Sequence, residues 1–175
     1  MNCGEKYCNF EGKFINKLRT RMRFLGNTEA RTDQKGRVFL PAMFRKILQT
    51  EGSESIVMRK DIAQPCLVLY PEKVWNEQMD ILRRRLSRWD ATQQNIFRQF
   101  VSDVEIVTLD AAGRFLIPKR YLRMAAIEQG IRFIGMGDTI EIWSDKNTEK
   151  AFMEPDEFSA ALQSIMAGAE ETTEE

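Results

Sequence analysis

Residues 33–41 read DQKGRVFLP, and residues 110–118 read DAAGRFLIP. Asp, Gly, Arg and Pro coincide in the two copies, and the three residues between Arg and Pro are apolar in both. A short helix-like segment follows each proline, with an aromatic residue three positions beyond it, and two strand-like runs come next. The same order of elements therefore occurs twice, which indicates a duplicated unit of about fifty residues.

Each copy is predicted to place a tight turn between two strands. The motif's aspartate can accept hydrogen bonds from the backbone ahead of it, and Gly36 and Gly113 can adopt positive φ. Pro41 and Pro118 should end the second strand, because proline has no N–H to donate to a ladder and its fixed φ suits the start of a helix. The predicted strands are 27–32, 37–40, 56–59 and 66–70 in the first copy, and 104–109, 114–117, 131–134 and 139–143 in the second.

A helical connector is predicted between the copies, and a further helix after the second copy. Asp90 is expected to cap the connector's second helix, which runs to Phe100. The last helix is expected to start at Pro155. The apolar positions that repeat at helical spacing are Trp75, Met79, Leu82 and Leu86 in the connector, and Phe158, Leu162 and Ile165 in the last helix.

The predicted organisation is an N-terminal extension over 1–21, a first repeat over 27–74, a connector over 75–102, a second repeat over 103–146, and a C-terminal helix with an acidic tail over 147–175. Before Met22 the extension shows no regular helical or strand spacing of apolar residues. We therefore expect it to be dispensable for folding and binding. One fifty-residue unit buries too little apolar surface to be stable alone. The two repeats should therefore complete each other's core and carry their turns on one surface.

The amino-acid composition argues against a membrane protein, an enzyme and a disulfide-rich protein. The 175 residues are 43% hydrophobic and 30% charged, as in ordinary soluble domains, and no apolar run is long enough for a membrane span. There is no histidine, and we find no paired catalytic carboxylates, phosphate loop or metal-binding set. We therefore expect no enzymatic activity, cofactor, metal or small-molecule substrate. Three cysteines, Cys3, Cys8 and Cys66, favour a reducing compartment over a disulfide framework.

The formal net charge is zero, but the charges are segregated along the chain. Basic residues crowd the first motif, and a second cluster comprises Arg83, Arg84, Arg85 and Arg88. We interpret that second cluster as a solvated helix face or as an interface that pairs with acidic residues. A DNA contact is the less favoured interpretation. Local charge matters more for binding than the sum.

The residues of the repeated motif have a structural and a functional interpretation. The aspartates and glycines most simply hold the turns. Arg37 and Arg114 are either solvated strand residues or contacts to phosphates and guanine edges, and the sequence weighs these two equally. Flanking basic residues can neutralise phosphates.

The doubled D-x-x-G-R-[apolar]₃-P signature resembles the AbrB-like swapped-hairpin DNA-binding module. Two copies in one chain resemble the MraZ family of bacterial transcriptional regulators. The resemblance covers about residues 22–146. It includes RFLGN at 23–27, DQKGRVFLPAMFRK at 33–46, CLVLYPEKVW at 66–75, VEIVTLDAAGRFLIP at 104–118 and FIGMGDTIEIW at 133–143.

The resemblance implies a mainly β (α+β) fold: a double-split, swapped-hairpin β-barrel formed by two AbrB-like repeats, with a helical connector and a C-terminal helix. It implies a ring-like homo-oligomer in the cytoplasm, associated with the nucleoid. It further implies sequence-specific binding to double-stranded promoter DNA, at G-rich direct repeats upstream of the division and cell-wall gene cluster. The DNA contacts would come from the turns at 33–37 and 110–114. The candidate DNA-binding residues that the resemblance implies are Asp33, Lys35, Gly36, Arg37, Arg45, Asp110, Gly113 and Arg114.

The second copy departs from the family pattern at two positions. Ala112 stands where the first copy has the basic Lys35, and Leu122 stands where it has Arg45. We therefore expect the second turn to contribute less to DNA affinity than the first. The alternative to a DNA-binding regulator is an oligomeric scaffold or antitoxin-like module that binds a protein partner.

Overall fold

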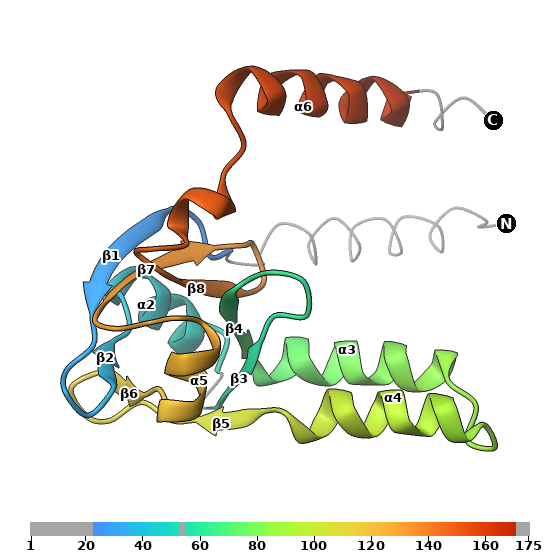
Figure 1. Cartoon of the computed structure of the whole chain (residues 1–175), viewed down its shortest axis with the longest axis horizontal. Helices are drawn as coiled ribbons and strands as arrows, with labels where there is room; N and C mark the ends of the chain where they lie inside the picture. The colour runs from blue at the N-terminus through green and yellow to red at the C-terminus, as the bar shows by residue number, and fades with distance from the viewer. Residues whose placement is uncertain (1–22, 53–54, 171–175) are drawn as a thin grey trace, which may run out of the picture.

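A computed structural model describes residues 23–52 and 55–170 (Figure 1). The predicted extension over 1–21 lies outside these residues. The described strands form a six-stranded antiparallel sheet, in the order β1-β7-β8-β4-β3-β5, and a two-stranded ribbon of β2 and β6. The strands are β1 (Asn27–Arg31), β2 (Arg37–Phe39), β3 (Ile56–Lys60), β4 (Cys66–Pro71), β5 (Glu105–Val107), β6 (Arg114–Leu116), β7 (Gly130–Gly135) and β8 (Ile140–Ser144).

Helices surround the sheets and extend beyond them. They are α2 (Ala42–Thr50), α3 (Glu72–Arg85), α4 (Ala91–Ser102), α5 (Lys119–Met124) and α6 (Pro155–Glu170), with a 3-10 turn η1 (Thr148–Ala151). The mixed α+β architecture and the C-terminal helix are confirmed. The described helices contain more residues than the described strands, so the fold is less dominated by β-structure than expected. Within residues 23–52 and 55–170, no helix is both long and apolar enough to cross a membrane.

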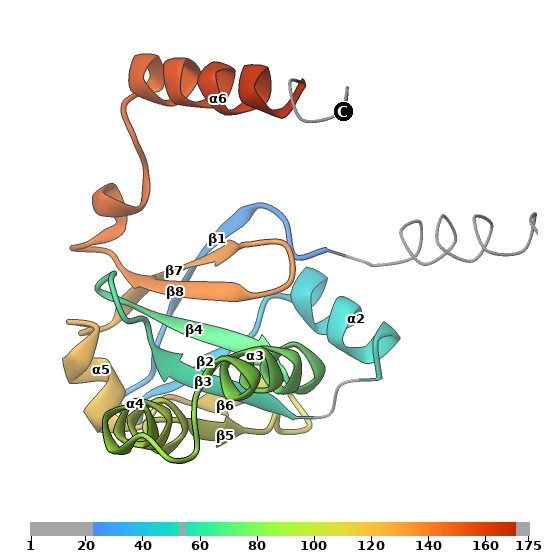
Figure 2. The ribbon, with the colours of Figure 1, turned by 90° about the vertical axis from the view of Figure 1, so that its right-hand side faces the viewer.

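Strands of the two repeats pair with each other. In the ribbon, Arg37 lies opposite Leu116 and Phe39 lies opposite Arg114. β1 pairs with β7, and β3 pairs with β5, again across the repeats. The strands before and after each turn consequently belong to different sheets. The ribbon lies at the opposite end of the molecule from α6 (Figures 1 and 2).

One core is shared by both repeats. Phe115, at the centre of β6, is buried, and its ring packs against Phe133 of β7 with centroids 6.4 Å apart. Phe44 and Tyr121, the aromatic residues three positions beyond the two prolines, are fully buried in the same cluster. Each repeat thus supplies apolar surface that the other covers, as the small size of one unit requires.

The strand expected over 104–109 is shorter than predicted. β5 ends at Val107, whose side chain is buried, and Thr108 and Leu109 lie outside the strand as the chain approaches the second turn. The β-branched and apolar composition of this stretch favoured a longer strand. The pairing partner sets the limit, because β5 pairs with only Ile56, Val57 and Met58 of β3.

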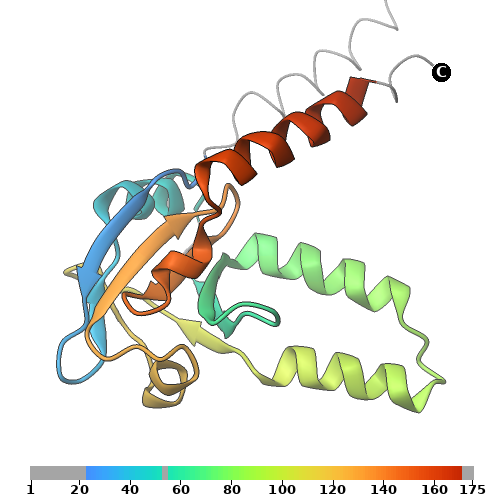
Figure 3. The ribbon, with the colours of Figure 1, turned by 45° about the horizontal axis from the view of Figure 1, so that its top comes forward.

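α3 and α4 form a helical arm, residues 72–102, that projects from the large sheet (Figures 1 and 3). Asp90 caps α4 as predicted, accepting a hydrogen bond from the N–H of Gln93 at 2.8 Å. At the arm's base, Trp75 stacks on Phe100 with centroids 5.1 Å apart, and the guanidinium of Arg59 lies 4.3 Å from the Phe100 centroid. These contacts fix the arm to β3.

Candidate nucleic-acid interface

Each D-x-x-G-R turn is held by its aspartate. The Oδ1 atom of Asp33 accepts hydrogen bonds from the N–H groups of Lys35 and Arg37, both at 2.9 Å. Its Oδ2 atom accepts a hydrogen bond from Nε of Arg37 at 2.7 Å. Asp110 makes the corresponding bonds in the second turn, including one from Nε of Arg114 at 2.9 Å. Each aspartate therefore shapes its turn and also orients the arginine.

The two carboxylates are set up to stay ionised. The hydrogen bond from the backbone N–H of Arg37 lowers the pKa of Asp33 below its ordinary value, and the N–H of Arg114 does the same for Asp110. Both aspartates are solvent-exposed. An ionised carboxylate that is already bonded to its own turn organises structure and does not act as a general acid.

The turn glycines are required by geometry. Gly36 and Gly113 have φ of +85° and +81°, a region that L side chains rarely adopt. A Cβ added to Gly36 would also lie 2.7 Å from the carbonyl oxygen of Ile117. The prediction that both residues are turn glycines is confirmed.

One face of the ribbon carries both motif arginines. Because side chains alternate along a strand, Arg37 and Phe39 project to one side of β2, and Arg114 and Leu116 project to the same side of β6. Phe39 is 57% exposed and Leu116 is 51% exposed. The guanidinium of Arg114 lies 5.7 Å from the Phe39 ring centroid. Arg37 and Arg114 are diagonal neighbours, for which antiparallel geometry gives a separation of about 7–8 Å.

The sequence analysis missed Phe39 and Leu116. Each is the middle residue of the apolar triplet between the arginine and the proline, which the sequence analysis noted only as apolar. The period-two alternation of a strand is the signal that could have found them, since it exposes the middle residue whenever the outer two are buried. Val38 and Leu40, on either side of Phe39, are both buried.

Arg45 lies beside the second turn, which corrects the expectation that it flanks the first. Its Nη1 atom donates to the carbonyl oxygen of Ala112 at 3.3 Å, and its side chain covers Gly113, where a Cβ would collide with the guanidinium. The equivalent residue of the second repeat, Leu122, instead packs against Gly36 of the first turn.

This exchange follows from the strand pairing. Since β2 and β6 run antiparallel, the end of each strand meets the start of the other. The N–H of Leu40 donates to the carbonyl of Gly113 at 3.0 Å, and the N–H of Ile117 donates to the carbonyl of Gly36 at 2.9 Å. The helix after each proline therefore begins against the turn of the other repeat.

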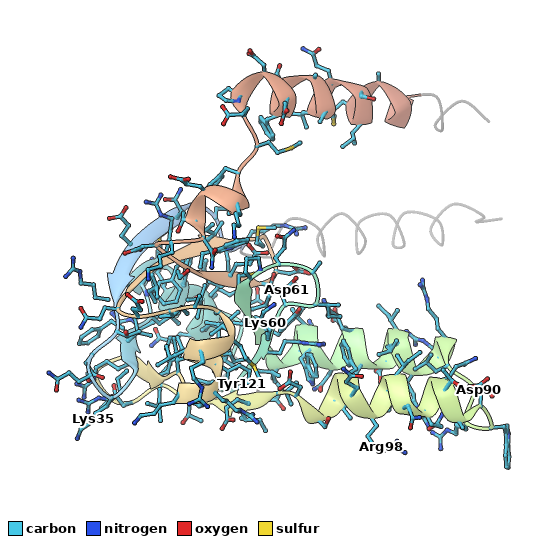
Figure 4. All side chains as sticks on the ribbon, viewed as in Figure 1. Lys35, Lys60, Asp61, Asp90, Arg98 and Tyr121 are labelled. Carbon is cyan, nitrogen blue, oxygen red and sulfur yellow. The ribbon has the colours of Figure 1, made fainter. Side chains whose placement is uncertain are left out.

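Basic charge is consequently divided between the two turns. Lys35 is exposed in the first turn and, in Figure 4, points outward from the end of the molecule. Arg45 supplies the additional charge to the second turn. The weaker second turn was predicted on the premise that Arg45 adds its charge to the first turn, and that premise is wrong. The relative contributions of the two turns to DNA affinity stay a prediction.

Two other groups are structural. Nη2 of Arg120 donates to Glu105 at 3.0 Å and to the hydroxyl of Tyr121 at 3.1 Å, which ties α5 to β5 and occupies this guanidinium. Burial raises the pKa of the Cys66 thiol to about 12, so the thiol is protonated at neutral pH. Among the described residues, no group of three or more His, Cys, Asp or Glu side chains could hold a metal ion.

Comparison with known proteins shows which family this sequence matches. The sequence profile described as "MraZ protein, putative antitoxin-like" matches residues 23–98 and again residues 100–166. The chain is 63% identical over 145 residues to "Transcriptional regulator MraZ" of Phocaeicola vulgatus, covering 83% of this chain and 94% of that protein. It is 58% identical over 152 residues to the protein of the same name from Bacteroides fragilis, covering 87% and 96%. It is 34% identical over 127 residues to that of Flavobacterium psychrophilum, covering 73% and 80%.

Proposed function

Because the chain belongs to the MraZ family, we propose that it is a sequence-specific DNA-binding transcriptional regulator of the bacterial division and cell-wall gene cluster. It would contact G-rich direct repeats in its own promoter through the two D-x-x-G-R turns and the ribbon between them. Membership in a family of transcriptional regulators also confirms the expectation of a protein that is not an enzyme.

The observation that carries this proposal is the ribbon with two arginines on one exposed face. The major groove of B-DNA is about 12 Å wide and admits a two-stranded β-ribbon. Diagonal neighbours about 7–8 Å apart span about two base-pair steps, at about 3.4 Å for each step. Arg37 and Arg114 are therefore spaced to contact bases within one short G-rich element.

The aspartates support base recognition by arginine. Nε of each arginine is bonded to the aspartate of its own turn. Among the described residues, the terminal nitrogens of Arg37 and Arg114 make no protein hydrogen bond. A guanidinium held at Nε with its terminal nitrogens available can donate two hydrogen bonds to O6 and N7 of guanine, the commonest specific contact in the major groove.

The remaining candidates have positioning roles. Lys35 and Arg45 each add a positive charge beside one turn and would neutralise phosphates flanking the bases. Gly36 and Gly113 keep the turns tight enough for the backbone to approach the duplex. Phe39 and Leu116 offer apolar surface for thymine methyl groups beside the guanines.

The proposed working form is a ring-like homo-oligomer of copies with double-split barrels, in the cytoplasm and on the nucleoid. α6 supports assembly, because its apolar side chains Phe158, Leu162 and Ile165 are exposed in the single chain. An amphipathic helix with an uncovered apolar side is typical of a subunit interface. Repeated copies would also match direct repeats in the operator, since linked sites raise the overall affinity.

Binding to the protein's own upstream DNA tests this function. We expect fluorescence anisotropy to show tighter binding to that duplex than to a scrambled duplex of the same composition. With four to six phosphate contacts, the plot of log affinity against log salt concentration should have a slope of roughly −4 to −5. Equal, weak binding to both duplexes would instead favour the scaffold or antitoxin-like alternative.

A further inference from the structure

The far end of the arm is basic and carries an exposed tryptophan. The arm tip, as we define it, consists of Arg84, Arg85, Arg88 and Trp89. All four residues are exposed, and Trp89 is 98% exposed. Asp90, the neighbouring acid, is committed to capping α4. Tryptophan and arginine are the residues most enriched at the energetic centres of protein interfaces, so this tip has the composition of an interface.

An acidic pocket lies at the other end of the same arm. It has a volume of about 370 Å³ and lies between the end of α2 and residues 72–80 of α3. Four of its lining residues are acidic and one is basic. The lining residues are Glu51, Gly52, Glu72, Lys73, Asn76, Glu77 and Asp80. Carboxylates gathered around a concavity attract a positively charged group of matching size.

Trp89 cannot enter this pocket within its own chain, although Asp80 of the pocket lies one helical turn from Arg84. α3 is a continuous helix from Glu72 to Arg85, so the tip loop begins about 20 Å along the helix axis from Glu72. A straight helix does not fold back on its own first turn. If Trp89 fills this pocket, the tryptophan must therefore come from a second copy of the chain.

The tip is also remote from the proposed DNA-binding turns. In Figure 4, Lys35 of the first turn and Asp90 beside the tip lie at opposite ends of the molecule. The ribbon and the arm likewise extend in opposite directions in Figure 1. A duplex seated on the ribbon face leaves the arm tip free, so the arginines of the tip are available to another partner.

We propose that the arm tip of one copy docks in the acidic pocket of a second copy. Trp89 enters the concavity, while Arg84 and Arg88 pair with the carboxylates on its rim. The tip and the pocket are different surfaces of one chain, so each copy offers one of each, and the contact repeats from copy to copy. Head-to-tail contacts of this type close into rings when the rotation between copies allows it. The inference rests on the proposed homo-oligomer and assigns its contact residues.

Charge reversal in the full-length protein tests the contact. The tip-reversed variant is Arg84→Glu/Arg88→Glu, and the pocket-reversed variant is Glu51→Lys/Glu72→Lys, whose two residues line the pocket away from the tip. We expect each variant alone to form smaller species than the wild type in size-exclusion chromatography with light scattering at micromolar concentration. The dissociation constant of assembly should rise on the order of tenfold or more, because close charge pairs at interfaces are strongly coupled.

Mixing the two reversed variants is the decisive measurement. The reversed tip of one variant complements the reversed pocket of the other, so an equimolar mixture should recover large assemblies that neither variant forms alone. A Trp89→Ala variant should weaken assembly without any change in charge. Arg98→Glu/Lys150→Glu is the matched control for the tip-reversed variant, since it lowers net charge by the same amount at exposed residues outside the tip and the pocket, and it should assemble like the wild type. Far-UV circular dichroism and melting curves should show that all variants are folded.

Several results would overturn the proposal. They are a monomeric wild type, reversed variants that assemble normally, or a mixture that recovers nothing. Loss of affinity for a single-repeat duplex in the tip-reversed variant, with assembly intact, would identify the tip as a DNA contact instead. Failure of the proposed function is distinguishable, because the wild type would then fail to prefer its own upstream DNA while its assembly still responded to charge reversal.

Discussion

Arg45 should be energetically coupled to the second turn and independent of the first. Replacing it by leucine gives the second turn the residue type that Leu122 supplies to the first. Arg45→Leu removes the hydrogen bond to the carbonyl of Ala112 and one positive charge beside Arg114. In a double-mutant cycle, the effect of Arg45→Leu on DNA affinity should shrink when Arg114 is already alanine. It should be unchanged when Arg37 is alanine.

The magnitude follows from the contacts. Residues that share a contact network typically couple by about 0.5–3 kcal/mol, whereas distant residues add to within about 0.3–0.5 kcal/mol. The bond from Arg45 to Ala112 is 3.3 Å long, at the weak end for a hydrogen bond. We therefore expect a coupling of about 0.5–1 kcal/mol with Arg114, or roughly two- to fivefold in Kd. Because each turn has one additional basic residue, Arg37→Ala and Arg114→Ala should cause similar losses.

Fluorescence anisotropy on a single-repeat duplex at moderate salt is the appropriate assay, since an operator with several repeats would multiply each loss across subunits. The matched variant is Leu122→Arg, which adds a charge beside the first turn and should couple to Arg37. Coupling of Arg45 to Arg37 with none to Arg114 would refute the exchange of helices between the turns.

Three further outcomes follow from the structure. Asp33→Asn/Asp110→Asn should lower the melting temperature at pH 7. The difference in melting temperature from wild type should shrink as the pH falls below about 4. The pKa of each carboxylate is lower in the folded state than its unfolded value of about 3.9, so its contribution to stability is complete above that value and is lost as the pH falls through the folded pKa. A pH-independent difference would contradict this. Arg59→Ala should destabilise the arm by about 1–2 kcal/mol in thermal melts, through lost packing and the lost contact with Phe100, and an unchanged melting temperature would count against it. In a variant whose other two cysteines are serine, Cys66 should react with a thiol reagent at pH 8 only after denaturation, because burial raises the pKa of its thiol to about 12; rapid labelling of the native protein would show that the thiol is accessible.

Local chemistry made much of this fold predictable. The aspartate-held turns, the positive φ of Gly36 and Gly113, and the cap at Asp90 all depend on residues within a few positions of one another. Residue type and spacing therefore specify them directly. The buried aromatic residue three positions beyond each proline was likewise visible as a shared feature of the two copies.

The features that could not be predicted from the sequence depend on long-range strand pairing. The place of Arg45 depends on β2 pairing with β6, a contact between residues more than seventy positions apart, so counting basic neighbours along the chain assigned it to the wrong turn. The exposure of Phe39 depends on which face of a three-residue strand meets the core. That face is set by register, and a shift of one residue would reverse it.

A modified duplex tests whether Arg37 and Arg114 recognise guanines in the major groove. Replacing the guanines of one upstream repeat by 7-deazaguanine removes the N7 acceptor while leaving base pairing intact. We expect wild-type affinity to fall by about 1–3 kcal/mol for each lost bidentate contact, and an Arg37→Ala/Arg114→Ala variant to be insensitive to the change. Unchanged wild-type affinity, or equal sensitivity in the double variant, would contradict it.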